Sequence, residues 1–407
     1  MNPLRVLMLG WEFPPFIAGG LGVACRDLST GLSREGVEIT FVMPHVPEGA
    51  SSPHVKLRGA NEVNVRVRHV DSILTPYMTN QNYHTAYQRY RTGHPSAVYG
   101  RNMGEEIERY TLAAGRIAAE EDHDIIHAHD WMTFQAAARA KKRSKKPLVV
   151  HVHATEHDRT GGKPNEYIKR IEQEGLDAAD HIITISEYMK RQIITNYRVD
   201  AAKVSVIHWG IDSEAWNSEQ KFVSPLSSSD KIVLFIGRMT IQKGPDYFVE
   251  AAQHVLAHEP NTRFVMAGDG DMMDSIISKV ISLGMANRFS FTGFLRGDAV
   301  HKAYQMADCY VMPSVSEPFG LVALEAASSN VPIILSRTSG VSEVMNHALR
   351  VDFWDTKQMA NKIVGVLRHT SLARELKHNG LTEVRQLTIN KPATKTIEVY
   401  NHLGVRN

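Results

Sequence analysis

Short apolar runs alternate with amphipathic segments along the whole chain. We predict strands at 4–9, 38–43, 125–129, 148–153, 179–186 and 204–208 in the first half, and at 231–236, 263–267, 288–291, 309–312, 332–335 and 349–351 in the second. Between them the apolar residues recur at helical spacing, as at 21–34 and 105–121. Strands that alternate with helices in this way predict doubly wound α/β sheets.

A polar stretch at 213–230, which contains three consecutive serines at 227–229, interrupts this pattern once. The strand and helix alternation then restarts. We therefore predict two Rossmann-like domains, residues 1–212 and 231–385, joined by a linker at 213–230. The length of 407 residues agrees with two or three domains.

The segment 309–325 is the most informative, because a buried strand, a loop and a helix follow one another there. Glu317 precedes a proline, so we expect it in extended geometry at the carboxyl end of the strand, where open α/β sheets bind ligands. Glu325 lies within the helix that follows. An anion site suited to phosphate is expected at the first N–H groups of this helix, those of Gly320, Leu321 and Val322. The alternative is that Glu317 is a turn residue and Glu325 a surface residue.

Two cations follow the first strand of the second half. Arg238 can place a forked pair of N–H groups on phosphate, and Lys243 supplies a point charge. Together with the helix start, they would be counter-charges for a diphosphate. Gly268 lies in another turn that permits close approach to a ligand. Gly20, in the run Gly19 to Gly22, does the same in the first half, although Cys25 replaces the third glycine of the dinucleotide fingerprint.

Three further segments each allow two interpretations. His127 and His129, like His151 and His153, project to one face at a spacing of two; we favour hydrogen-bonding groups around a polar ligand over metal ligands. The basic run 139–146 is interpreted as a solvated helix end in preference to a contact with anionic lipid. The tyrosine-rich segment 71–104 is interpreted as a variable insertion in preference to an acceptor platform.

The composition narrows the function. With 46 basic and 44 acidic residues the net charge is +2, which gives no reason to expect a nucleic-acid partner. Cys25 and Cys309 lie in separate apolar segments, so neither a disulfide nor a zinc motif is expected. We find no pattern of a signal peptide or membrane span and expect a cytoplasmic protein without integral membrane contact. Peripheral membrane contact stays open.

Five motifs in this order resemble the retaining glycosyltransferases of family 4. They are Gly19 to Gly22, His127 to Trp131, His208 to Asp212, Gly237-Arg238 with Lys243-Gly244, and two glutamates with seven residues between them, Glu317 and Glu325. This resemblance covers nearly the whole chain. It implies the GT-B fold, in which two Rossmann-like doubly wound domains face each other across a cleft. It also implies that the last segment, 386–407, crosses back to the first domain.

The resemblance also implies roles for individual residues. The catalytic set would be Glu317 on the hydroxyls of the donor sugar, Arg238 and Lys243 on the donor diphosphate, and His153 at the reaction centre. The donor would further contact Gly20, Gly268, Phe319, Gly320, Leu321 and Val322, with Glu325 on the ribose. Asp130 and Trp131 are candidates on the acceptor side. The family needs no metal or cofactor; its donor, a nucleotide sugar, is a substrate.

The opening segment 11–21 and the turn after His129 resemble the glycogen and starch synthase branch, which implies UDP- or ADP-glucose as donor and a glucan or another saccharide as acceptor. One departure is Ile17, where bacterial glycogen synthases have lysine; it weakens the case for a strict ADP-glucose preference and for polymer elongation. Three alternatives stay open: a family 4 enzyme acting on a lipid-linked or cell-surface precursor, a metal-dependent hydrolase built on the histidines, and a non-catalytic protein that binds nucleotide sugars.

Overall fold

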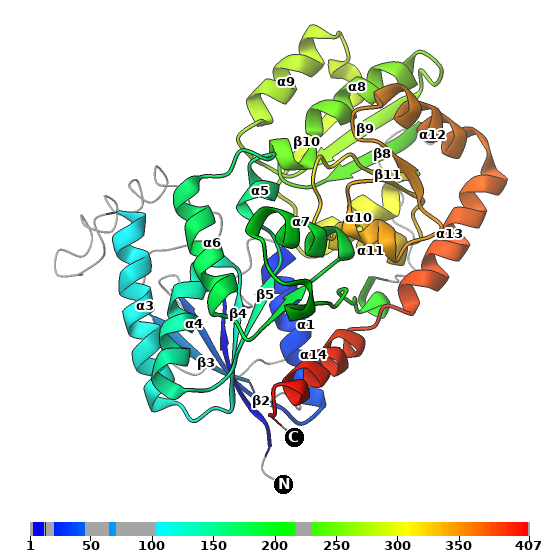
Figure 1. The fold of residues 1–407 in the computed structure, drawn as a ribbon. Helices are drawn as coiled ribbons and strands as arrows, with labels where there is room; N and C mark the ends of the chain where they lie inside the picture. The colour runs from blue at the N-terminus through cyan, green and yellow to red at the C-terminus, as the bar shows by residue number, and fades with distance from the viewer. Residues whose placement is uncertain are drawn as a thin grey trace.

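The computed structural model describes residues 3–11, 13, 20–44, 65–70, 102–216 and 230–405. Within these ranges the chain forms two parallel sheets with helices on both faces (Figure 1). The first sheet has seven strands in the order β3-β2-β1-β4-β5-β6-β7, and the second has six in the order β10-β9-β8-β11-β12-β13. This is the predicted architecture of two Rossmann-like domains.

The first domain contains seven strands and the helices between them. The strands are β1 (Arg5–Leu9), β2 (Glu38–Pro44), β3 (Val65–Val70), β4 (Ile125–His129), β5 (Leu148–Val152), β6 (His181–Thr184) and β7 (Val204–Val206). The helices are α1 (Gly20–Arg34), α3 (Met103–Glu120), α4 (Trp131–Ser144), α5 (Glu156–Arg159), α6 (Glu166–Ala178) and α7 (Glu187–Tyr197).

Strand β1 shows why these strands are apolar throughout. Leu7 and Leu9 pack into one core, which includes residues of α3, α4 and α6, while Val6 and Met8 pack into another, which includes residues of α1. Because helices cover both faces of the sheet, the side chains on both faces of each strand need to be apolar.

The second domain is built in the same way. Its strands are β8 (Lys231–Ile236), β9 (Thr262–Ala267), β10 (Phe289–Gly293), β11 (Cys309–Met312), β12 (Ile333–Ser336) and β13 (Leu349–Val351). Its helices are α8 (Pro245–Leu256), α9 (Met273–Ser282), α10 (Asp298–Met306), α11 (Leu321–Ser328), α12 (Thr356–Arg368) and α13 (Thr370–Arg385). The predicted strands 231–236, 309–312 and 349–351 are confirmed to the residue.

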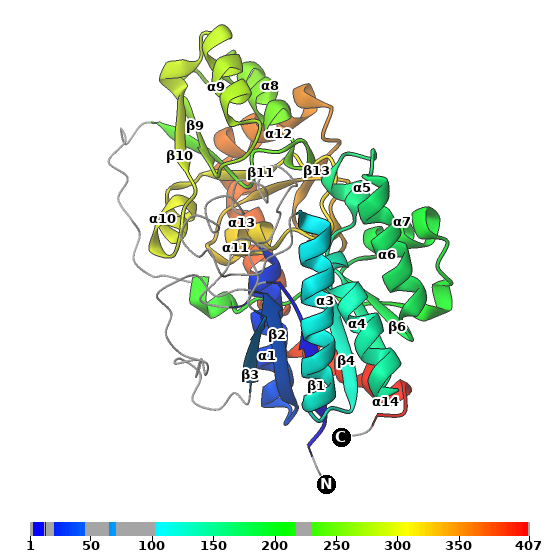
Figure 2. The same cartoon turned by 90° about the vertical axis from the view of Figure 1, so that its left-hand side faces the viewer.

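The last helix, α14 (Asn390–His402), returns to the first domain and packs against α1. Figure 2 shows α14 at the foot of the first domain, below α13. Gly31 of α1 makes the close contact possible, because a Cβ there would lie 2.7 Å from Cβ of Ala393. The returning chain also touches the connection that follows β7, where Ile211 N–H donates to the carbonyl of Leu387 at 2.7 Å.

One feature of the first domain differs from the prediction, and another agrees with it. Strand β3 was not predicted; it pairs with β2 at the edge of the sheet. The basic run 139–146 forms the end of α4 and the turn after it, and Lys141 donates to the carbonyl of Ala178 and to Asp180, both at 2.8 Å. Among the described residues no helix is both long and apolar enough to cross a membrane.

Candidate active site between the two sheets

A cleft of about 980 Å³ lies between the carboxyl ends of the two sheets. A cavity of this size suits a ligand larger than a single sugar. The predicted site residues that line it are Gly20, Asp130, Trp131, His153, Arg238, Lys243, Gly268, Glu317, Phe319, Gly320, Leu321 and Val322. Glu325 is the one predicted site residue that is not part of the lining.

On the second-domain wall, the predicted cations follow β8 in a short 3-10 turn, η3 (Ile241–Lys243). Lys243 Nζ donates to Oε2 of Glu317 at 2.6 Å, and both side chains are largely buried. Arg238 donates from Nη2 to Oε1 of Gln242 at 3.2 Å. The ion pair neutralises the Glu317 carboxylate and places the ammonium group of Lys243 in the wall of the cleft.

Glycines allow the turns of this wall to pack against one another. Gly268 has φ +137°, and a Cβ there would lie 1.8 Å from the carbonyl oxygen of Gly237. A Cβ on Gly244 would lie 2.3 Å from the carbonyl oxygen of Pro313. The cation-bearing turn is therefore held directly against the ends of β9 and β11.

The loop between β11 and α11 has the predicted geometry. Glu317 forms a short parallel bridge with Ser339, its N–H donates to the carbonyl of Thr338 at 2.9 Å, and Ser314 Oγ donates to its carboxylate at 3.1 Å. Gly320 caps α11 with φ +114°, a value that favours glycine. The first N–H groups of α11 have no partner within the helix, and Gly320 and Leu321 line the cleft, so this helix start can receive an anion.

Glu325 lies one turn further along α11. The hydroxyl of Tyr304 donates to its Oε2 at 3.0 Å. Burial raises the pKa of Glu325 to about 7; the hydrogen bond from Tyr304 opposes the rise, and Asp27 of α1 adds to it. The alternative of an exposed surface residue is therefore wrong for Glu325.

The first-domain wall meets the second through aromatic rings. The imidazole of His153, just after β5, lies 5.2 Å from the ring of Trp209, which makes an edge contact at 5.6 Å with Phe319 of the second domain. Nearby, a Cβ on Gly20 would lie 4.0 Å from Cδ1 of Leu321. The start of α1 thus faces the start of α11 across the cleft.

Asp130 has a structural task at this wall. It has φ +59°, which is strained for a residue with a side chain, and its Oδ1 accepts the N–H groups of His153 at 2.7 Å and Ala154 at 3.4 Å. Burial raises the pKa of Asp130 to about 6, although Arg159 and these two N–H groups oppose the rise. Asp130 therefore fixes the turn that carries His153.

The four histidines of β4 and β5 form a buried array. Nδ1 of His129 and Nε2 of His153 lie 2.8 Å apart, and Nε2 of His127 and Nδ1 of His151 lie 3.3 Å apart. Nδ1 of His127 is hydrogen-bonded to the hydroxyl of Tyr400 in α14 at 2.6 Å. Burial lowers the pKa of all four, so the array is neutral.

Two sets of side chains place donor atoms within 4.8 Å of one another, as a metal site would. One joins Cys25 of α1 to His129 and His153, and the other consists of His127, His129 and His151. Two nitrogens on one tetrahedral zinc lie roughly 3.3 Å apart, which exceeds the contact between His129 and His153. In the second set, the rings of His127 and His129 are stacked 4.5 Å apart at 15°. Ring lone pairs lie in the ring planes, so these two do not converge on one ion. The geometry favours the hydrogen-bonding interpretation.

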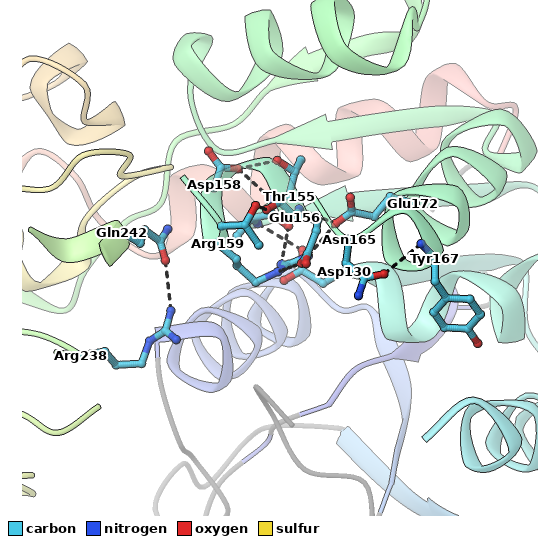
Figure 3. Close-up of polar contacts among 12 residues, drawn as sticks. Asp130, Thr155, Glu156, Asp158, Arg159, Asn165, Tyr167, Glu172, Arg238 and Gln242 are labelled. Atoms are coloured by element: carbon cyan, nitrogen blue, oxygen red, sulfur yellow. Dashed lines mark hydrogen bonds and ion pairs between the residues drawn. The ribbon is translucent and has the colours of Figure 1, made fainter. Parts of the chain in front are cut away.

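Arg159 of α5 is a cleft residue that the sequence analysis missed (Figure 3). Its guanidinium donates to Glu156 at 3.0 Å, to the carbonyl of Ala154 at 3.0 Å and to Glu172 at 2.6 Å. Burial alone would lower its pKa, but Glu172, Asp130 and Glu156 raise it above the ordinary value. The polar run that follows β5 was the only sequence signal that could have indicated Arg159.

Two features of the sequence analysis lie outside the described residues. They are Ile17 and residues 71–101 of the tyrosine-rich segment.

The two sheets and the cleft between them define a two-domain protein with the GT-B fold, and sequence comparison identifies its family. Two family models match: Glycosyltransferase Family 4 over residues 18–215 and Glycosyl transferases group 1 over residues 217–382. An uncharacterised glycosyltransferase of Methanocaldococcus jannaschii is 32% identical over 84% of this chain and 83% of its own length. The chain belongs to the family 4 glycosyltransferases, with the GT-B fold.

Two other similarities bear on the branch and the fold. A glycogen synthase of Mycobacterium tuberculosis is 28% identical over 84% of this chain and 80% of its own length. The Anabaena protein HepE, solved in complex with UDP-glucose, superposes with a TM-score of 0.71 over 98% of this chain and 100% of its own, at 16% identity. The chain is therefore similar to the glycogen synthase branch in sequence, while the structural likeness concerns the fold alone.

Proposed function

We propose that this protein is a retaining hexosyltransferase that moves a glucosyl group from UDP- or ADP-glucose to a glucan or another saccharide, in the cytoplasm and without a metal or cofactor. The single observation that carries the proposal is the pairing of two walls. Arg238, Lys243 and the start of α11 line one side of the cleft, and His153 lines the other. The glycogen synthase relative and the UDP-glucose complex of HepE support the choice of donor.

The charges on the second-domain wall suit the departure of a nucleoside diphosphate. When the bond between the anomeric carbon and the phosphate oxygen breaks, negative charge grows on the diphosphate and positive charge on the sugar. Arg238, Lys243 and the helix start would stabilise the diphosphate, at roughly 3 kcal/mol for each well-aimed donor. Lys243 would then exchange its contact with Glu317 for the phosphate, which frees the Glu317 carboxylate for sugar hydroxyls.

The neutral first-domain wall suits the sugar and the acceptor. The Nδ1 atom of His153 is buried without a hydrogen-bond partner among the described residues, so a donor-sugar hydroxyl is a suitable partner for it. Trp131 and Asp130 line the same wall and are acceptor-side candidates. The acceptor hydroxyl would attack from the face that the diphosphate leaves, form the new bond to the anomeric carbon and give its proton to a phosphate oxygen. Configuration is then retained.

A panel of nucleotide sugars tests the proposal. The full chain is incubated with UDP-, ADP- or GDP-glucose, with and without a glucan or a small sugar, and release of the nucleoside diphosphate is followed together with the anomeric configuration of the product. We expect release that depends on acceptor, an α-linked product from an α-linked donor, and full activity in chelator. An inverted product, or release abolished by the chelator, contradicts the mechanism. Lys243→Ala supplies the background rate.

A further inference from the structure

Glu317 is flanked by two hydrogen-bonding sites that reach it from the other domain. On one side, Ser316 Oγ donates to Oδ1 of Asp158 in α5 at 2.6 Å. On the other, Ser186, the N-cap of α7, donates from Oγ to the carbonyl of Pro318 at 2.6 Å. The partners are separated by 158 and 132 residues in the chain. The first domain therefore forms hydrogen bonds with the residue immediately before Glu317 and with the residue immediately after it.

Each hydroxyl group around Ser316 and Pro318 donates its proton to a defined acceptor. Because the proton of Ser316 goes to Asp158, the hydroxyl of Tyr188, 2.9 Å from Ser316 Oγ, must be the donor of their contact. Oδ2 of Asp158 accepts the N–H and the hydroxyl of Thr155 at 2.8 and 2.7 Å. Asp158, Ser186 and Ser316 are 2%, 0% and 7% exposed, so loss of one partner would leave a buried polar group unsatisfied.

The second domain supports the same loop from behind. The N–H of Gly340 donates to the carbonyl of Glu317 at 2.9 Å, and the N–H of Val341 to that of Phe319 at 2.8 Å. A Cβ on Gly340 would lie 2.2 Å from the Pro318 carbonyl oxygen and 2.8 Å from Ser186 Oγ. Only glycine leaves room there for Ser186 to reach Pro318.

A second anchor keeps α7 in place. The carboxylate of Glu343, in the 3-10 turn η5 (Gly340–Glu343), accepts the N–H groups of Glu187 and Tyr188 at 2.8 and 2.7 Å, and His208 Nε2 lies 2.9 Å from it. These N–H groups belong to the first turn of α7, where a carboxylate is stabilised by the helix dipole. The helix that supplies Ser186 and Tyr188 is therefore fixed to the second domain.

We propose that Ser186, Tyr188 and Asp158 are positioning residues that set the Glu317 carboxylate when the two domains meet. The proposal rests on the proposed role of Glu317. The contacts of the Glu317 carboxylate with Lys243 and Ser314 lie within the second domain and do not depend on the first domain. The contacts at Ser316 and Pro318 join the two domains. The loop is therefore held on both sides of Glu317 only when the two domains are together, which links transfer to a cleft that excludes water.

The test uses the full chain and compares Ser316→Ala and Tyr188→Phe with a matched control. Both variants should lower kcat about tenfold with the KM for the donor unchanged, because a misplaced reacting group slows the chemical step. The control is Ser29→Ala: Ser29 is also fully buried and donates to a carbonyl at 2.6 Å, but within α1. It should keep the wild-type kcat. If Ser316→Ala and Tyr188→Phe both keep the wild-type kcat, the proposal is overturned.

A double variant separates positioning from a general structural effect. If Ser316 acts through Glu317, then Ser316→Ala combined with Glu317→Gln should be no slower than Glu317→Gln alone. Additive losses would overturn the proposal. Full activity of Glu317→Gln itself would instead contradict the proposed function. Urea unfolding of each variant confirms that the rates refer to folded protein.

Discussion

The carboxyl edges of the two sheets carry different polar groups, although both domains have the same kind of fold. The second edge presents Arg238, Lys243 and the start of α11 on turns that glycines allow to pack closely. The first presents His153, one of four neutral histidines, and a guanidinium, Arg159, whose charge is compensated by Glu156 and Glu172. Under the proposed function, the second-domain wall would bind the anion and the first-domain wall the uncharged sugar.

This division suits the chemistry of the sugar diphosphate that we propose as donor. Charge would develop on the phosphates, so cations on that wall would stabilise the transition state more than the ground state. A cation beside the sugar would oppose the positive charge that grows at the anomeric carbon. The lowered pKa of His153 keeps this ring neutral, which suits a position next to the sugar.

The largest effect is expected at Lys243. Replacing it with alanine removes the cation closest to Glu317 and leaves that buried carboxylate without its 2.6 Å partner. We expect kcat/KM to fall by about a hundredfold or more, because a donor aimed at developing phosphate charge is lost. Arg238→Ala should have a similar effect. Initial rates of nucleotide release measure both.

A matched lysine sharpens this result. Lys279 also lies in the second domain and pairs with a carboxylate, Glu250, at 2.7 Å, but it is not among the residues that line the cleft. Lys279→Ala should leave kcat/KM close to the wild-type value. Equal losses in Lys243→Ala and Lys279→Ala would mean that the cations stabilise the domain and do not serve the reaction.

The next effect concerns stability and pH at Glu325. Its folded-state pKa of about 7 exceeds the ordinary 4.5, so the folded protein holds this proton more tightly than the unfolded chain. Stability from the protonated group is complete below pH 4.5 and is lost as pH rises toward 7. Glu325→Gln avoids this loss, so its gain in unfolding free energy over wild type should grow from near zero at pH 4.5 to about 3 kcal/mol at pH 8. Urea unfolding at several pH values measures it.

Glu343→Gln should show the opposite trend. Burial alone would raise the pKa of Glu343, but His208 and the N–H groups of Glu187 and Tyr188 lower it. Its stabilising contribution is therefore present above pH 4.5 and is lost at more acidic pH. The deficit of this variant should be largest near neutral pH and shrink on acidification. A parallel trend in both variants would contradict the assignment of either carboxylate.

The sequence was most informative where one local segment contains the whole signal. The apolar run 309–312, the proline after Glu317 and the glycine at position 320 predict a strand, an extended residue and a helix start without any distant partner, and the structure shows all three. The cations at Arg238 and Lys243 precede their own helix within a few residues. Local segments of this kind are sufficient to predict the backbone geometry of this wall, while its role in phosphate binding stays a prediction.

The first-domain wall could not be predicted in the same way, because its interactions join distant segments. Arg159 depends on Glu172, and Ser186 on the carbonyl of Pro318, 132 residues away. Strand β3 was missed because it is an edge strand in which Arg66, Arg68 and His69 interrupt the valines, so it lacks a continuous apolar run. Only the folded chain shows which of these polar groups meet.

A moderate effect is expected on the neutral wall. His153→Ala should lower kcat/KM for the donor about tenfold, because one hydrogen-bonding group to the sugar is lost while the phosphate contacts remain. The control is His123→Ala. His123 is also buried and its Nε2 has no hydrogen-bond partner among the described residues, but it is not part of the cleft lining. A loss at His153 larger than that at Lys243 would reverse the comparison between the walls.

The smallest effect is expected at the junction between α14 and the histidine array. Tyr400→Phe removes the 2.6 Å hydrogen bond to His127 and should lower the unfolding free energy by about 1 kcal/mol, with little change in kcat. Tyr110→Phe is the matched control: both tyrosines are fully buried, but the hydroxyl of Tyr110 has no partner among the described residues. Its removal should be neutral or stabilising. Equal losses in the two variants would show that the bond from α14 adds nothing beyond the packing of the ring, and that the array needs no partner from the returning helix.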